Sequence, residues 1–224
     1  MGGIVIIGAG QAGAALAARL RAIGHDGQVT LIGEEPVAPY QRPPLSKAYL
    51  LGEMGLDRLL LRGETFWADH GIDLHTGTRV AAIDTEAREV VCADGQRIGY
   101  EMLALTTGSV PRRLPEAMGG GLGGVHTVRT LADVDAMAPL FSGGRRVLIV
   151  GGGYIGLEAA AVAASRGLAV TLVEAAPRIL QRVACAETAD YFRALHKGHG
   201  VEIREGVGLE RLTGTGTGTV DGAL

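Results

Sequence analysis

A glycine-rich hexapeptide that occurs twice constrains the fold of this chain more than any other feature. The first copy spans residues 8–13 and follows the apolar run 4–7. The second copy spans residues 151–156 and follows the apolar run 147–150. Short β-branched runs are typical of buried parallel strands, and glycines at this spacing let a strand turn directly into a helix. The sequence therefore predicts two strand–turn–helix units of the same kind.

Each hexapeptide is followed by the same order of elements. An alanine-rich stretch comes next in both copies and predicts a helix, the first of them over residues 11–23. The next strands are predicted at residues 29–32 and 170–173. They lead to Glu34 and Glu174, which lie 21 and 18 residues after the last glycine of their hexapeptides. Both spacings are close to the roughly 20 residues at which an acid binds a ribose hydroxyl in dinucleotide-binding units.

The two units together form a dinucleotide-binding pattern. In each hexapeptide the first glycine permits a tight turn, the second lets backbone approach a pyrophosphate, and the third packs the helix against the strand. The N-terminus of the helix offers unpaired N–H groups and about half a positive charge to the phosphates. One such hexapeptide is a weak signal, but two copies in the full context predict two bound dinucleotides.

The acids restrict which dinucleotides bind. Glu174 would repel a 2′-phosphate, which favours NADH over NADPH at the second unit. Arg178 and Arg182 follow closely, however, and leave NADPH open. FAD carries the same adenosine pyrophosphate as the nicotinamide nucleotides, so the first hexapeptide does not distinguish FAD from a second nicotinamide nucleotide.

The repeat predicts an α/β protein with two Rossmann-like dinucleotide-binding domains. Between the copies lie shorter predicted strands at residues 80–83, 89–92 and 102–105. A stretch rich in proline and glycine, residues 111–124, is the expected boundary. We therefore expect a first domain over residues 1–110 and a second domain over residues 111–224. The 36 glycines among 224 residues fit this fold, because close backbone approaches require them.

Composition excludes several other classes of protein. The net charge of −3 and the isoelectric point near 6.1 give no electrostatic reason to expect nucleic acid or a membrane surface as a partner. The two cysteines, Cys92 and Cys185, lie 93 residues apart, which excludes a local dithiol motif and a zinc ribbon. The N-terminus lacks the pattern of a secretory signal, and no run is long enough to span a membrane. We therefore expect a cytoplasmic protein without a metal site.

The segment 39–50 is the remaining unusual stretch. Its tandem prolines fix two φ angles and remove two N–H donors, so it is predicted to be a stiff arm that holds Arg42 and Lys47 in defined positions. The alternative is a solvated loop before a helix, with Ser46 as the helix cap and Lys47 merely exposed.

Several of these motifs resemble those of the FAD-containing, NADH-dependent ferredoxin reductases that serve Rieske oxygenases and bacterial cytochromes P450. The resemblance runs from residue 1 to about residue 212. It is carried by residues 8–13, the sequence Arg-Pro-Pro-Leu-Ser-Lys at 42–47, and residues 107–115, 128–131, 151–158 and 170–178. It implies a glutathione reductase-like arrangement of two dinucleotide-binding domains, with FAD and NAD as cofactors and a ferredoxin-type iron–sulfur protein as partner.

The resemblance also implies roles for individual residues. FAD would lie against the first hexapeptide, with further contacts from an acid, the arm and two later positions: Gly8, Gly10, Ala12, Gly13, Glu34, Arg42, Lys47, Val80 and Arg129. NADH would lie against the second: Gly151, Gly153, Ile155, Gly156 and Glu174. Lys47 would stand beside the flavin ring, and Glu158 would be its acidic partner, so these two are the candidate catalytic residues.

The chain also departs from this family. Thr106 replaces an alanine of the usual Ala-Thr-Gly stretch, and members continue with a Gly-Asp motif and a C-terminal domain that are absent here. The end of the chain, residues 213–222, is expected to form a hairpin within the NAD domain, so we expect a truncated product that binds FAD weakly. The expected function is hydride transfer from NADH to FAD and single-electron transfer to ferredoxin; the alternative is a nucleotide-binding module without reductase activity. A disulfide reductase is disfavoured, because that chemistry needs a cysteine pair beside the flavin.

Overall fold

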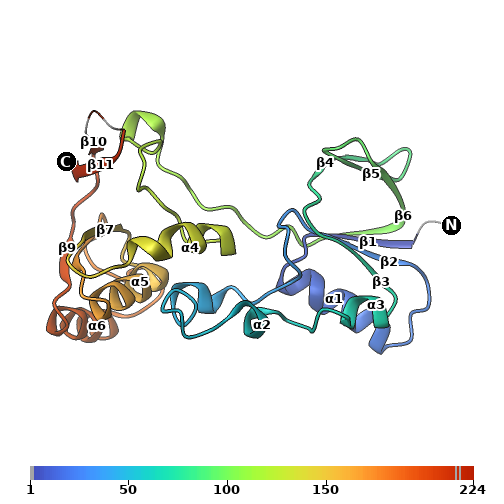
Figure 1. Ribbon diagram of the computed structural model, residues 1–224, viewed down its shortest axis with the longest axis horizontal. Coiled ribbons are helices and arrows are strands. Elements are labelled where there is room, and N and C mark those ends of the chain that lie inside the picture. Colours follow the sequence, from blue (N-terminus) through green and yellow to red (C-terminus); the bar gives the residue numbers. More distant parts are fainter. Residues whose placement is uncertain (1–2, 215, 217) are drawn as a thin grey trace. The chain divides into compact units, whose positions relative to one another are not determined.

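The computed structural model describes residues 3–214, 216 and 218–224, and it divides into two compact units. Unit 1 consists of Met1–Gln41 and Gly55–Ser109; unit 2 consists of Arg42–Met54 and Val110–Leu224. Figure 1 labels the elements of both units along the chain. The segment 42–54, which includes residues 42–50 of the proline arm, is therefore part of the unit that carries the second hexapeptide.

Unit 1 is built on a sheet in the strand order β3-β2-β1-β6-β5-β4. Its strands are β1 (Gly3–Ile7), β2 (Val29–Ile32), β3 (Ile72–His75), β4 (Val80–Asp84), β5 (Glu89–Cys92) and β6 (Arg97–Leu105). The pairs β2–β3, β1–β2 and β1–β6 are parallel, whereas β4–β5 and β5–β6 are antiparallel. The predicted strands are confirmed, and β3 is an additional strand that the sequence patterns did not indicate.

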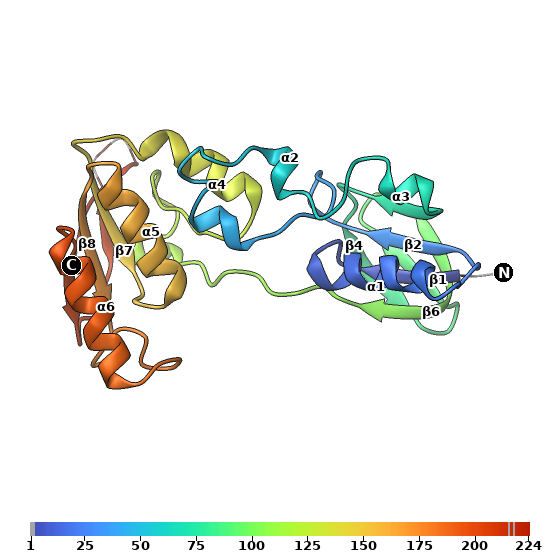
Figure 2. The ribbon, with the colours of Figure 1, turned by 90° about the horizontal axis from the view of Figure 1, so that it is seen from below.

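Both faces of the central strands in unit 1 are buried. Helix α1 (Gln11–Ala22) runs alongside β1 and β2 (Figure 2) and packs on the face that carries Ile6 and Leu31. The short helix α3 (Phe66–Asp69) adds Trp67 to the same core. The opposite face carries Val5, which packs with Val90 of β5. Burial on both faces explains why β1 is a continuous apolar run rather than an alternating one. A further short helix, α2 (Leu56–Leu59), completes unit 1.

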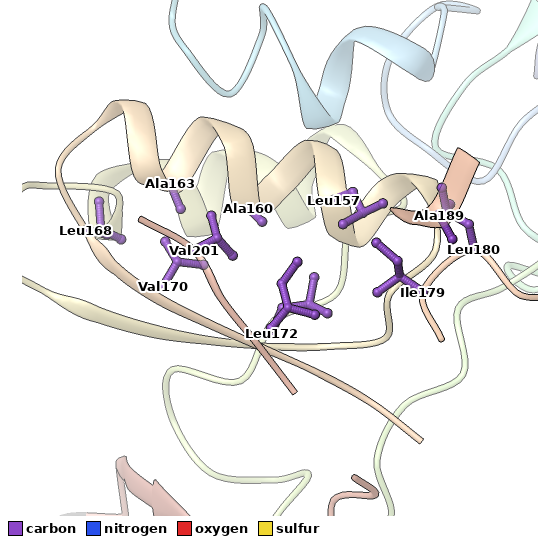
Figure 3. Packing of buried hydrophobic residues seen from close by; sticks show 11 residues of the cluster. Leu157, Ala160, Ala163, Leu168, Val170, Leu172, Ile179, Leu180, Ala189 and Val201 are labelled. Carbon is purple, nitrogen blue, oxygen red and sulfur yellow. The ribbon is translucent and has the colours of Figure 1, made fainter. Parts of the chain in front are cut away.

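Unit 2 has a three-stranded parallel sheet in the order β7-β8-β9. Its elements are α4 (Leu131–Met137), β7 (Arg146–Val150), α5 (Tyr154–Ser165), β8 (Ala169–Glu174), α6 (Ala186–Gly198), β9 (Glu202–Glu205), β10 (Leu212–Gly214) and β11 (Val220–Ala223), with two short 3₁₀ turns, η2 (Glu116–Met118) and η3 (Ala138–Leu140). In Figure 3, Leu157, Ala160 and Ala163 of α5 point toward the strand residues Val170 and Leu172. This cluster forms the core of unit 2.

The expected hairpin near the end of the chain is present, because β10 and β11 pair antiparallel. The expectation also covered residues 215 and 217, which lie outside the described part of the chain. No helix among the described residues is long and apolar enough to cross a membrane.

Segment 42–54 is held within unit 2 by polar contacts along its length. Its first element is the 3₁₀ turn η1 (Pro43–Ser46). The Arg42 guanidinium donates to the backbone carbonyl of Arg129 at 2.6 Å, and the Arg166 guanidinium donates to the carbonyl of Leu51. The Tyr49 hydroxyl donates to Asp135 at 2.7 Å. Burial, this hydrogen bond and the Asp135 charge raise the pKa of Tyr49 to about 12, so the hydroxyl remains a donor at neutral pH.

Candidate dinucleotide-binding sites

The two glycine hexapeptides form turns with matching backbone geometry. Gly8 and Gly151, the first glycines, both have a φ of +110°, a value that L side chains rarely adopt. Each turn links a parallel strand to a 12-residue helix, β1 to α1 and β7 to α5. The repeat predicted from the sequence is therefore a repeat of structure as well.

The third glycines bring each helix against its own turn. A Cβ atom on Gly13 would collide with the carbonyl oxygen of Gly8, and one on Gly156 would collide with the carbonyl oxygen of Gly151. Both obstacles are backbone atoms, which cannot rotate away as a flexible side chain could. Glycine is thus required at these positions for the helix to begin where it does.

The second glycines face open space. A Cβ atom built on Gly10 or Gly153 would meet no atom within 4 Å. These residues are the N-caps of α1 and α5, and neither helix has a side-chain cap or an acidic residue in its first turn. The first N–H groups of each helix therefore lack a side-chain acceptor, and the backbone in front of them is bare. This combination of unpaired donors and an uncovered approach fits a pyrophosphate group.

The residues predicted to line these turns lie at the helix N-termini. Ala12 is exposed in the first turn of α1, and Ile155 is 54% exposed in the first turn of α5. Thr106, which replaces the alanine expected from the resemblance, donates its hydroxyl to the carbonyl of Gly8 at 2.8 Å. The departure at this position therefore adds a hydrogen bond to the first turn.

The two acids differ in how they are held. The Glu174 carboxylate accepts from the backbone N–H of Gly152 at 2.7 Å and from that of Ala176 at 2.8 Å. One carboxylate oxygen faces each donor, so the group is fixed beside the second glycine turn. Glu34 is exposed and instead pairs with Arg79 at 3.4 Å. Each acid retains lone pairs that can accept from a ribose hydroxyl.

Val80 and Arg129 lie next to other predicted site residues of their units. Val80 is the first residue of β4 and follows Arg79 directly. The N–H of Thr78 donates to the carbonyl of Gly33 at 2.8 Å, which holds this loop against the end of β2 beside Glu34. In unit 2, the carbonyl of Arg129 accepts from Arg42. The structure thus brings Glu34 and Val80 into one neighbourhood, and Arg42 and Arg129 into another.

Arg178 is engaged with backbone carbonyls. Its guanidinium donates to the carbonyl of Ala184 at 2.9 Å and makes longer hydrogen bonds to those of Gln181 and Cys185. The guanidinium therefore provides hydrogen-bond donors to the backbone carbonyls of the turn before α6. This geometry disfavours the alternative, left open by the sequence, in which Arg178 binds the 2′-phosphate of NADPH.

Lys47 and Glu158 meet, although 111 residues separate them in the chain. The Lys47 ammonium lies 2.7 Å from Glu158 Oε1, and the Ser46 hydroxyl donates to Glu158 Oε2 at 2.5 Å. Ser46 is buried, with 4% of its surface exposed, so the alternative in which it caps a helix in a solvated loop is wrong. The Lys47 side chain is 48% exposed, and an ion pair of that exposure contributes about 1 kcal/mol or less to stability. This contribution to stability is smaller than that of an ion pair shielded from water.

A family model described as pyridine nucleotide-disulphide oxidoreductase matches residues 2–223, nearly the whole chain. The chain belongs to this family. Membership implies two dinucleotide cofactors, FAD and NAD(H), and the paired glycine turns fit both. The two cysteines of the chain, buried Cys92 of unit 1 and exposed Cys185 of unit 2, are both free thiols in the structure.

The relatives and the solved structure described next are all named as reductases of ferredoxin or putidaredoxin. The chain is 48% identical over 201 residues to a ferredoxin–NAD(P)(+) reductase of a Sphingomonas species, covering 90% of this chain and 48% of that protein. It is 40% identical to the putidaredoxin reductase of Pseudomonas putida, covering 91% and 49%. A crystal structure of the covalent putidaredoxin reductase–putidaredoxin complex matches with a TM-score of 0.96 at 37% identity, covering all of this chain and 54% of that one. The chain thus spans about half the length of the relatives it matches.

A second ion-pair network, which the sequence patterns did not indicate, lies at the end of β9. Glu205 pairs with Arg193 of α6 through both carboxylate oxygens, at 2.7 and 2.9 Å. The same carboxylate accepts from the N–H of Ile179 at 2.7 Å. Ile179 is fully buried and packs against Gly152 of the second glycine turn. The only sequence signal was an acid at the end of a third strand, which the patterns did not identify.

We expect this network to make the stability of unit 2 fall in acid. Burial raises the pKa of Glu205, but the hydrogen bonds from Arg193 and the Ile179 N–H outweigh burial, so the pKa lies below its ordinary value. A depressed carboxyl pKa contributes stability above the unfolded pKa of roughly 4.3, and this contribution is lost as the pH falls through the folded pKa. Urea unfolding followed by circular dichroism between pH 7 and pH 3 measures it.

The matched variants are Glu205→Gln and Glu210→Gln. Glu205→Gln should be less stable at pH 7 and should lose less stability on acidification than the unmodified chain. Glu210 is exposed and makes no ion pair in the described structure, so its replacement should leave the acid dependence unchanged. Identical acid dependence in the unmodified chain and in Glu205→Gln would contradict the assignment.

Proposed function

We propose that this chain binds FAD at the first glycine turn and NADH at the second. In this proposal it takes part in hydride transfer from NADH to FAD, followed by single-electron transfer to a ferredoxin-type iron–sulfur protein. Residues 1–110 would be the first segment of the FAD-binding domain and residues 111–224 the NAD-binding domain. Segment 42–54 is the exception to this division, because it lies between residues 1 and 110 in the sequence but is part of unit 2.

The paired glycine turns carry this proposal. Each combines a first glycine of positive φ, a third glycine packed on backbone and an uncovered second glycine at an uncapped helix. An unliganded α/β domain has no need for an uncapped, unobstructed helix N-terminus at both copies. Two such turns in one chain support two dinucleotides, and the family supplies their identity as FAD and NAD(H).

Bound FAD would supply the ability to accept a hydride and release single electrons. The residues of the chain bind and orient. The backbone donors at Gly10 and Gly153 would hold the pyrophosphates, and Glu174 would accept from the adenosine ribose of NADH. Lys47 would present its ammonium to the flavin, while Glu158 keeps that ammonium in place. Arg42 and Arg129 would contribute positive charge toward the FAD phosphates.

The acceptor is proposed from the relatives. Those named above are ferredoxin and putidaredoxin reductases, and one of them was crystallised in a covalent complex with putidaredoxin. We propose a protein acceptor of the same chemical class for the protein to which this chain belongs. A cytoplasmic location forms part of the proposal, because both cysteines are free thiols, which suits a reducing compartment.

The test is reduction of bound flavin by NADH. We expect the purified chain, loaded with FAD, to show visible flavin bands that bleach on mixing with NADH in a stopped-flow instrument. Lys47→Ala and Glu158→Ala should each slow bleaching, and the double variant should lose less than the sum of the two effects, because the residues act as a pair. Bound NADH without any bleaching would support a nucleotide-binding module instead. Wild-type rates in both single variants would remove the pair from the site.

A further inference from the structure

Glu158 has two partners in the arm, and only one of them is charged. Lys47 reaches Oε1 at 2.7 Å and the Ser46 hydroxyl reaches Oε2 at 2.5 Å. A serine hydroxyl can donate one hydrogen bond, and here Glu158 Oε2 accepts it. The carboxylate is therefore held at both oxygens by two adjacent residues of one segment.

The two partners differ in burial. Ser46 is 4% exposed, whereas the Lys47 side chain is 48% exposed and also donates to the carbonyl of Pro43 at 3.2 Å. A hydrogen bond to a charged group is strong when it is shielded from water, and a half-exposed ion pair is weak. The short, buried contact thus fixes the carboxylate more firmly than the ion pair does.

We propose that Ser46 is a positioning residue, which orients the Glu158 carboxylate so that Oε1 faces the Lys47 ammonium. Ser46 is the last residue of the 3₁₀ turn Pro43–Ser46, and the two prolines of this turn restrict the backbone that leads to the serine. An ammonium has three donors, and the described contacts use two of them. The consequence for the flavin rests on the proposed function: the third donor of Lys47 is held ready for the cofactor.

The lysine content of the chain makes this orientation measurable without any cofactor. Lys47 and Lys197 are the only two lysines in the sequence. Acylating reagents such as an N-hydroxysuccinimide ester must reach the Nζ atom, and the Glu158 carboxylate 2.7 Å away restrains that atom and covers one side of it. The rate at Lys47, divided by the rate at exposed Lys197 and followed by mass spectrometry, therefore reports how well Glu158 engages Lys47.

We expect Ser46→Ala to raise this ratio by about threefold to fivefold, the range that corresponds to the loss of a partly exposed ion pair. Glu158→Gln should raise the ratio by the same amount, and the double variant should raise it no further, because the serine acts through the carboxylate. Ser46→Cys keeps a weak donor in a similar volume and should give an intermediate ratio. Ser165→Ala removes a hydroxyl at the other end of α5, where it donates to the Val162 carbonyl, and should leave the ratio unchanged.

An unchanged ratio in Ser46→Ala, or additive effects of Ser46→Ala and Glu158→Gln, would overturn the proposal. Lys197 serves as the folding control, since its absolute rate should stay constant in every folded variant. If Ser46→Ala fails to fold, the Ser46→Cys ratio decides alone: a ratio equal to that of the unmodified chain rejects the role. The expected ratios in a chain that binds neither FAD nor NADH would support the role of Ser46 while rejecting the proposed function.

Discussion

Gly156→Ala is expected to destabilise unit 2 by about 1–3 kcal/mol and to abolish NADH binding, because the new Cβ would collide with the backbone of Gly151. The carbonyl oxygen in its way belongs to the turn itself, so relief requires α5 to move away from β7. Such a movement would displace the N–H groups that face the phosphates. Stability and binding should therefore be lost together.

Gly153→Ala is the matched comparison in the same turn. Its Cβ would meet no atom within 4 Å, and its φ of −80° suits alanine, so the free energy of unfolding should change by about 1 kcal/mol or less. The methyl group would nevertheless occupy the open approach to the helix N-terminus. We expect NADH affinity to fall at least about tenfold, the lower end of what lost hydrogen bonds to a charged group cost.

Two measurements separate these variants. Urea unfolding by circular dichroism gives stability, and NADH titration by fluorescence or calorimetry gives affinity. The single tryptophan, Trp67, lies in the core of unit 1, so its fluorescence reports whether unit 1 stays folded while unit 2 is altered. Equal NADH affinity in Gly153→Ala and the unmodified chain would contradict a pyrophosphate site at this turn.

Glu174→Ala is expected to weaken NADH binding by about tenfold to a hundredfold, because a hydrogen bond to a charged acceptor contributes roughly 1.5–3 kcal/mol. Its carboxylate is already oriented by the N–H groups of Gly152 and Ala176, so no ordering cost opposes ribose binding. NADPH binding should change little or improve, since the repulsion of the 2′-phosphate disappears. The preference of the chain for NADH over NADPH should thus largely vanish.

Parallel titrations with NADH and NADPH measure this preference. Glu34→Ala is the control, because Glu34 belongs to unit 1 and pairs with Arg79 there. Its replacement should leave both nicotinamide nucleotides unaffected. NADPH binding by the unmodified chain that equals or exceeds NADH binding would refute the role of Glu174.

The elements that depend on local sequence could be predicted. Strand β1, helix α1 and their counterparts β7 and α5 follow from short apolar runs, helix-forming residues and glycines within a few positions of one another. Local backbone preferences and periodicity determine such elements with little help from distant residues. The same holds for Glu34 and Glu174, because the length of one helix and one strand sets their distance from the glycine turn.

The contacts between distant segments could not be predicted from those patterns. The sequence alone determined two glycine turns, their helices and the acids that follow them, since each depends on neighbouring residues. Only the tertiary structure placed segment 42–54 in unit 2, joined Ser46 to Glu158, and directed Arg178 toward backbone carbonyls. The family resemblance implied the pair of Lys47 and Glu158, but the local patterns did not. The physical reason is that a polar side chain takes the partner that packing brings within about 3 Å, and packing depends on the whole chain.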